Sequence, residues 1–174
     1  MMLIIITKDK KIRTFYSGAG SKSGLWGRVL ELNVTDDQDR ATNALKKALS
    51  LLGADEPLCL VGHGNDTEIG GSGKTRDPWG WRFDEIAPML AALPHRPSVV
   101  LIEACAEEED DGTKIDPIFG FAQALADQLN KPGQAGRMSG CTVYGYTNET
   151  DSQHTLPNPG TIARSVEVVP YLIH

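Results

Sequence analysis

Two apolar runs in the sequence lead into residues that can do covalent chemistry. The run Leu58–Val61 leads into His63, and the run Val99–Ile102 leads into Cys105. A continuous apolar run of this length predicts a buried strand of a parallel sheet. Ligands bind in the crevice beyond the carboxyl ends of such strands. If the two strands are neighbours, an imidazole and a thiol lie side by side at one edge of the sheet.

An imidazole beside a thiol is the arrangement that a cysteine nucleophile needs. The thiol attacks as a thiolate, and the imidazole can raise the thiolate fraction or protonate a departing amine. The amides of Gly64 and Cys105, at the strand ends, can stabilise an oxyanion. We therefore predict His63 and Cys105 as catalytic residues and Gly64 as part of an oxyanion hole. The alternative for each residue alone is structural: a packed thiol and an ordinary loop histidine.

Length and composition indicate one globular domain over residues 1–174. The chain is 40% hydrophobic and 23% charged, as in an ordinary globular protein. Its net charge of -6 argues against nucleic acid or an anionic membrane as a partner. No stretch approaches the roughly 20 apolar residues that span a bilayer. The apolar N-terminal run lacks the basic segment of a signal peptide.

The spacing of the cysteines and of the remaining histidines does not predict a metal site. Cys59, Cys105 and Cys141 are an odd number at wide spacings, which fits neither a disulfide framework nor zinc. A reducing compartment, the cytoplasm, is therefore expected, with export as an effector lacking a classical signal peptide as the alternative. Residues 70–75 resemble a phosphate-binding loop but have Glu68 where the first glycine belongs. We expect no metal and no cofactor.

Hydrophobic periodicity predicts strands that alternate with helices. Residues 8–32 and 65–81 are expected to be loops, and Trp79 and Trp81 are expected to pack on the sheet, a substrate groove being the alternative. The alternation predicts an α/β three-layer sandwich with a mostly parallel central sheet and helices on both faces. The expected strands are Met2–Thr7, an edge strand within Val29–Val34, the two apolar runs, Cys141–Tyr146 and Val166–Ile173; the expected helices are Ala41–Leu52, capped by Asp36 or Asp37 and ended by Gly53, Phe83–Leu93 and Pro117–Leu129.

The sequence around the two chemical residues resembles a known family. Val61-Gly62-His63-Gly64, followed by Leu101-Ile102-Glu103-Ala104-Cys105, resembles the caspase-like cysteine peptidases, which include caspases, metacaspases, legumain, clostripain, gingipains and toxin-processing peptidases. The resemblance covers about residues 2–147, because the helices and the next strand also fall in family order. It implies a caspase-like sandwich, a His63–Cys105 dyad and the Gly64 amide in the oxyanion hole.

The same resemblance implies a specificity for the cleavage site. Glu103 stands where related enzymes carry an acidic or amide side chain in the primary specificity pocket, and Asn148 and Asp151 stand where they build one wall of it. A carboxylate there would bind Lys or Arg before the scissile bond, with a legumain-like preference for Asn as second choice. Residues 106–109 lack the Gly or Ser common after the family's thiol. The alternative for Glu103 is a solvated carboxylate or the partner of a nearby Arg.

These expectations describe a thiol protease that hydrolyses protein or peptide substrates as a monomer or homodimer, the dimer pairing through Val166–Ile173. One alternative is a non-catalytic adaptor or regulatory module of the same fold. The other is a cysteine hydrolase or acyl transferase acting on a non-peptide substrate, because a fold does not fix the substrate.

Overall fold

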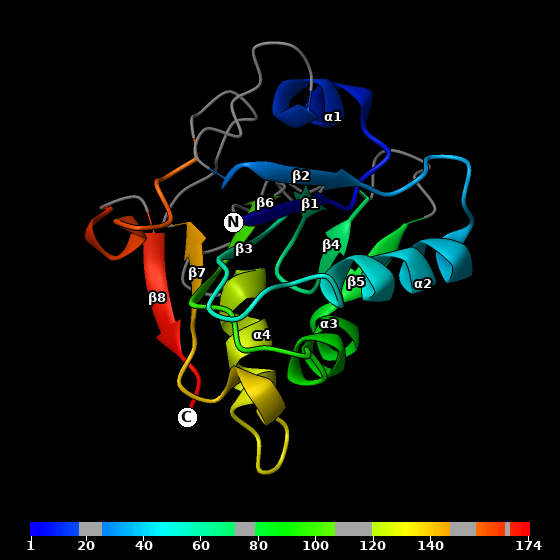
Figure 1. Ribbon diagram of the computed structural model, residues 1–174. Helices are drawn as coiled ribbons and strands as arrows, with labels where there is room; N and C mark the ends of the chain where they lie inside the picture. Colours follow the sequence, from blue (N-terminus) through cyan, green and yellow to red (C-terminus); the bar gives the residue numbers. More distant parts are fainter. Residues whose placement is uncertain (18–25, 72–78, 107–119, 147–155, 166–167) are drawn as a thin grey trace, which may run out of the picture.

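The structure is a computed structural model that describes residues 1–17, 26–71, 79–106, 120–146, 156–165 and 168–174, and at Cys105 and Ala106 the backbone alone. The described residues form a mixed sheet and four α-helices (Figure 1). Short 3-10 turns lie at Gly136–Met138 and Ile162–Arg164. The elements are β1 (Met2–Ile5), α1 (Lys10–Ser17), β2 (Arg28–Glu31), α2 (Gln38–Leu49), β3 (Leu58–Gly64), β4 (Glu68–Gly70), β5 (Gly80–Arg82), α3 (Phe83–Ala91), β6 (Val99–Ala106), α4 (Phe121–Leu129), β7 (Thr142–Tyr146) and β8 (Val168–Leu172).

The central sheet is mostly parallel. Its strands lie in the order β2-β1-β3-β6-β7-β8, and all of these neighbours are parallel except β7 and β8. Beside β3, the short antiparallel strands β4 and β5 extend the sheet. This arrangement confirms the predicted α/β class with a mostly parallel central sheet.

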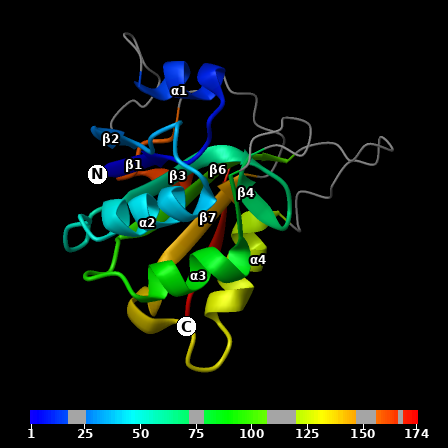
Figure 2. The ribbon, with the colours of Figure 1, turned by 90° about the vertical axis from the view of Figure 1, so that its right-hand side faces the viewer.

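Helices cover both faces of the sheet and make three layers. In Figures 1 and 2 helix α1 lies on one side and helices α2, α3 and α4 lie on the other. Each face of the sheet carries its own hydrophobic core. Because side chains alternate along a pleated strand, successive residues belong to opposite cores. On β3, for example, Leu58 and Leu60 pack towards α2–α4, whereas Cys59 and Val61 pack towards α1. The predicted αβα sandwich is therefore confirmed.

The connections place a topological switch point between β1 and β3. The chain leaves β1 through α1 on one face to reach β2, and it returns through α2 on the opposite face to reach β3. Where neighbouring parallel strands send their connections to opposite faces, a crevice opens beyond their carboxyl ends. The site is thus expected beside the ends of β1 and β3.

Most of the elements expected from periodicity are present, with different bounds. Helix α2 begins after Asp37, whose Oδ1 accepts the N–H of Arg40 at 2.9 Å. The helix ends at Leu49 with Ser50 as its C-cap, earlier than the predicted stop at Gly53. Strand β8 lies at the sheet edge as predicted.

Helix α1 corrects the expectation of a loop over residues 8–32. Oδ1 of Asp9 accepts the N–H groups of Lys11 at 2.7 Å and Ile12 at 2.9 Å, and so caps the first turn. Ile12 and Tyr16, one turn apart, are buried against the sheet. An eight-residue helix has little stability of its own. Packing on the sheet therefore decides this helix, and the polar local sequence gives a weak signal for it.

The expectation of a loop over residues 65–81 is also wrong in part. Strands β4 and β5 pair within this segment, and Oδ1 of Asn65 accepts the N–H groups of Thr67 at 2.8 Å and Glu68 at 2.9 Å at the turn into β4. Trp79 and Trp81 are each 1% exposed, which confirms that they pack in the core. Strands β4 and β5 have three residues each, which is too few to show the alternating pattern of a strand in the sequence.

Candidate active site

The predicted catalytic residues lie on neighbouring strands in the same register. Strands β3 and β6 are paired in parallel over seven residue pairs, from Leu58 with Val100 to Gly64 with Ala106, and His63 is the register partner of Cys105. Paired strands are about 4.8 Å apart. The backbone of Cys105 therefore lies directly beside that of His63, near the carboxyl ends of both strands.

Asp9 is a further residue of this site. Its Oδ2 lies 3.3 Å from Nε2 of His63, and the two side chains are 25% and 21% exposed. This close contact lacks the alignment of a hydrogen bond, so it acts through charge when the imidazole is protonated. Partial burial raises the pKa of the Asp9 carboxyl, but the N–H groups of Ile12 and Lys11 and the nearby His63 together lower it below its ordinary value. Asp9 is therefore a stable anion beside the imidazole.

The chain after β1 is fixed by hydrogen bonds that position Asp9. Oγ1 of the buried Thr7 accepts the N–H of Asp9 at 3.2 Å. Arg13, from the next turn of α1, donates to the carbonyl of Thr7 at 3.0 Å and to that of Leu32 at 2.9 Å. The same guanidinium pairs with Glu31 of β2 at 2.7 Å. These contacts tie the start of α1 to the ends of two strands.

Asp9 was missed by the sequence analysis although a signal for it exists. Residues 2–6 form a third apolar run, and it too leads into polar residues, Thr7 and Asp9. The pattern is the same as that before His63. The expectation of a loop after the first strand concealed the helix that Asp9 caps, and the adjacency of β1 and β3 is visible only in the fold.

Glu103 is buried beneath α1 and is 4% exposed. Its Oε1 accepts a hydrogen bond from the hydroxyl of Tyr16 at 3.0 Å. Burial raises the pKa of the Tyr146 hydroxyl, and the nearby Glu103 carboxylate raises it further. The same two causes, burial first, raise the pKa of the Cys59 thiol. Glu103 is thus not a freely solvated carboxylate, and its position in a specificity pocket stays a prediction.

Gly64 is enclosed by backbone on both sides. Its register partners are Ile69 of β4 and Ala106 of β6. A Cβ atom at this position would lie 2.9 Å from Cβ of Ala104 and 2.9 Å from the carbonyl oxygen of Glu68. Close packing of three strands therefore requires glycine here. The proposed part of Gly64 in an oxyanion hole is a separate matter and remains a prediction.

The other two cysteines are unsuited to nucleophilic chemistry. Cys59 and Cys141 are free thiols, 0% and 1% exposed. Burial raises the pKa of Cys59 well above its ordinary value and that of Cys141 to about 11. Both agree with the predicted structural role.

The two tryptophans expected to pack on the sheet have core partners. Nε1 of Trp79 donates to the carbonyl of Asp36 at 3.0 Å, and Nε1 of Trp81 donates to Oγ1 of Thr42 at 2.9 Å. Each indole N–H is thus satisfied by the region around the start of α2.

Several sequence predictions fall outside the described residues. These are the pocket-wall residues Asn148 and Asp151, and residues 72–75 of the segment that resembles a phosphate-binding loop. Within the described ranges, no group of three or more His, Cys, Asp or Glu side chains is arranged to hold a metal ion. No helix in these ranges is long and apolar enough to cross a membrane.

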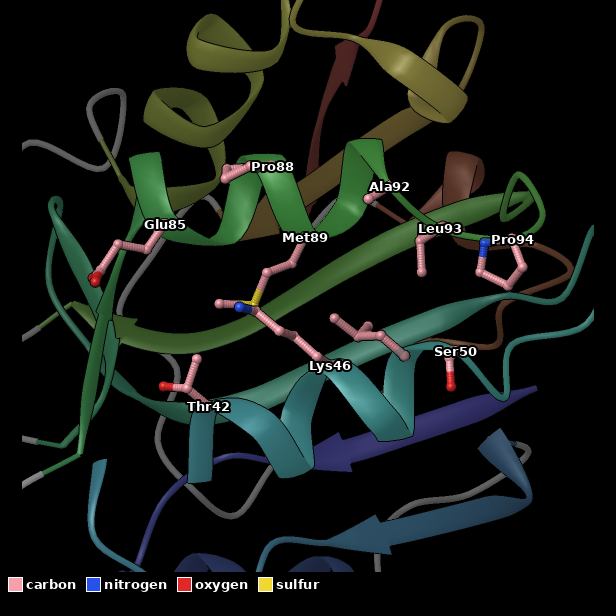
Figure 3. A pocket seen from close by; sticks show the side chains of 10 residues that line it. Thr42, Lys46, Ser50, Glu85, Pro88, Met89, Ala92, Leu93 and Pro94 are labelled. Atoms are coloured by element: carbon pink, nitrogen blue, oxygen red, sulfur yellow. The ribbon is translucent and has the colours of Figure 1, made fainter. Parts of the chain in front are cut away.

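A surface groove lies on the opposite side of the sheet from this site. It has a volume of about 570 Å³ and runs between α2 and α3, where Lys46, Met89 and Leu93 contribute to its walls (Figure 3). Helices α2 and α3 cover the face away from α1. The groove therefore has no part in positioning His63.

No protein-family model matches the sequence, and no curated protein matches it. The resemblance of the His-Gly and Ala-Cys motifs to caspase-like peptidases therefore remains a prediction from the motifs alone.

The packing around Gly64 predicts the result of a single substitution. We expect Gly64→Ala to lower the free energy of unfolding by about 1–3 kcal/mol, because the added methyl group meets backbone and a core Cβ. Gly160→Ala is the matched control, since its Cβ would only approach Oδ1 of Asn158 at 3.4 Å, and its stability should stay within about 0.5 kcal/mol of the wild type. Urea unfolding measures both. Equal stability of the two variants would contradict the enclosed position of Gly64.

Proposed function

We propose that the protein is a cysteine endopeptidase in which Cys105 is the nucleophile and His63 the acid-base catalyst. The observation that carries the proposal is the register of β3 and β6, because it pairs the backbones of these residues near the carboxyl ends of two adjacent parallel strands. Two further facts support it. The imidazole of His63 lies against the carboxylate of Asp9. The thiols of Cys59 and Cys141 are buried and therefore unsuited to attack a substrate.

The proposed reaction divides peptide hydrolysis into two steps. The Cys105 thiolate attacks the carbonyl carbon, and a C–S bond forms while the carbonyl oxygen becomes an oxyanion. Backbone amides of Gly64 and Cys105 stabilise that charge. Protonated His63 gives its proton to the amine as the C–N bond breaks, which leaves a thioester. A water molecule deprotonated by His63 then attacks the thioester, and the C–S bond breaks to release the acid and the thiol.

The proposed substrate is a protein or peptide with Lys or Arg before the scissile bond. The support is the place of Glu103 on β6, two residues before Cys105, and its burial beside Tyr16. A carboxylate held in a buried position binds a cationic side chain more strongly than one in water. Asp151 is proposed as a further substrate-binding residue from its place in the sequence. A reducing compartment such as the cytoplasm suits the free thiols of Cys59 and Cys141.

A thiol-labelling experiment tests whether Cys105 is the nucleophile. A peptidyl acyloxymethyl ketone should label the native wild type once, at Cys105, and Cys105→Ala should abolish both labelling and peptide cleavage. The matched control is Cys141→Ala, which should keep both, because with a pKa of about 11 the Cys141 thiol is about one part in a thousand ionised at pH 8. Mass spectrometry locates the label.

Each outcome of the labelling experiment has a defined meaning. Labelling at Cys141, or no labelling of the native protein, would contradict the proposal and favour the non-catalytic adaptor. Labelling at Cys105 without cleavage of any peptide in a diverse library would favour a cysteine hydrolase or acyl transferase that acts on another substrate.

A fluorogenic peptide library tests the specificity. The wild type should cleave after Arg or Lys, and Glu103→Gln should lower kcat/KM for these peptides by about 10- to 100-fold, the value of a charge-assisted hydrogen bond. Tyr16→Phe is the matched control, because it removes the hydroxyl from Glu103 but keeps the carboxylate, and it should keep the basic preference. Cleavage after Asn, or a basic preference that survives Glu103→Gln unchanged, would contradict the assignment.

A further inference from the structure

Helix α1 contacts both functional parts of the candidate site. At its start, Asp9 lies against the imidazole of His63, and at its other end Tyr16 donates to Glu103. The helix is anchored between these points by Arg13, which is bonded to the ends of β1 and β2. The imidazole thus contacts a residue far from it in the sequence.

The two carboxylate oxygens of Asp9 have separate partners. Oδ1 accepts the N–H groups of Lys11 and Ile12, which is what an N-cap requires. Oδ2 takes no part in the cap and lies 3.3 Å from Nε2 of His63. Capping would be served equally by Ser, Thr or Asn. Asp9 therefore has a second oxygen, Oδ2, that the helix cap does not use and that lies beside the imidazole.

The neighbouring cations are directed to other groups. Lys8 places its ammonium 4.8 Å from the centre of the Trp79 ring. Arg13 is bonded to two carbonyl groups and paired with Glu31. Within the described ranges, the ion pair recorded for the Asp9 carboxylate is therefore the one with His63.

We propose that Asp9 is the positioning residue of the catalytic imidazole: it holds His63 through Nε2, leaves Nδ1 for the thiol and the leaving amine, and stabilises the imidazolium. This inference rests on the proposed peptidase function. Asp9 itself touches neither the substrate nor the reacting atoms. It acts by fixing the ring, and it favours the protonated form that gives the proton to the amine.

The kinetic test compares Asp9→Asn with the wild type. The amide keeps an oxygen for the helix cap but loses the charge, so kcat should fall about 10- to 100-fold with KM little changed. A purely structural role for Asp9 would lower stability without lowering kcat of the folded protein.

The matched control is Asp37→Asn in the N-cap of α2. Asp37 caps its helix as Asp9 caps α1, accepting the N–H of Arg40 at 2.9 Å, but it lies outside the candidate site. Its kcat should equal that of the wild type. An Asp9→Asn variant with the same kcat as Asp37→Asn would overturn the inference while the peptidase itself remains active. A wild type that cleaves no peptide would overturn the proposed function, and this inference with it.

A measurement without substrate tests the contact independently. Urea unfolding of Asp9→Asn, His63→Gln and the double variant forms a cycle that isolates the interaction of the two side chains. The combined loss should be smaller than the sum of the single losses, because each single variant already removes the contact between the two side chains. Additive losses would overturn the inference whether or not the protein is an enzyme.

Discussion

The parallel pairing of β3 with β6 is the constraint on which the candidate site depends. Its seven paired positions set His63 opposite Cys105. A slip by one residue would set His63 opposite an alanine and would reverse the faces of the strand. Both strands are buried on both faces, so two separate cores fix this register. The backbone geometry of the candidate site therefore depends on hydrophobic packing well away from its polar residues.

Helix α1 completes that geometry. Helix α1 lies over the face that carries Glu103 and brings Asp9 to the end of β3. Because β1 and β3 send their connections to opposite faces, the space beside their ends is open to receive this residue. Helix α1 thus covers the hydrophobic core on its side of the sheet, and it also positions Asp9 beside His63. Its position links the fold directly to the candidate chemistry.

The sequence was sufficient for the central strands, for three of the helices and for the fold class. Long apolar runs and a regular helical period reflect burial, which is decided by many side chains at once. The run at β6 and the stripe of α2 are clear examples. Helix α1 and the hairpin of β4 and β5 could not be predicted in this way. The two strands have only three residues each, helix α1 lies in a segment rich in polar residues, and each element is stabilised by partners distant in the sequence.

The same limit applies within the site. His63 and Cys105 follow apolar runs, and the sequence predicts them as candidates, whereas the run before Asp9 is expected to end in a loop. Its role depends on the adjacency of β1 and β3, which no local pattern contains. Glu103 was singled out from the motif, but its burial beside Tyr16 follows from the position of α1. Local sequence thus proposes candidate residues, while their neighbours in space follow from the topology.

The most direct test of the account is a kinetic cycle of His63→Ala, Cys105→Ala and the double variant, with kcat/KM measured on the best peptide substrate. Residues that act as one unit lose nearly everything when either is removed. The account predicts that each single variant is as impaired as the double variant. Substantial cleavage by His63→Ala, or losses that multiply in the double variant, would show that the imidazole and the thiol do not work together.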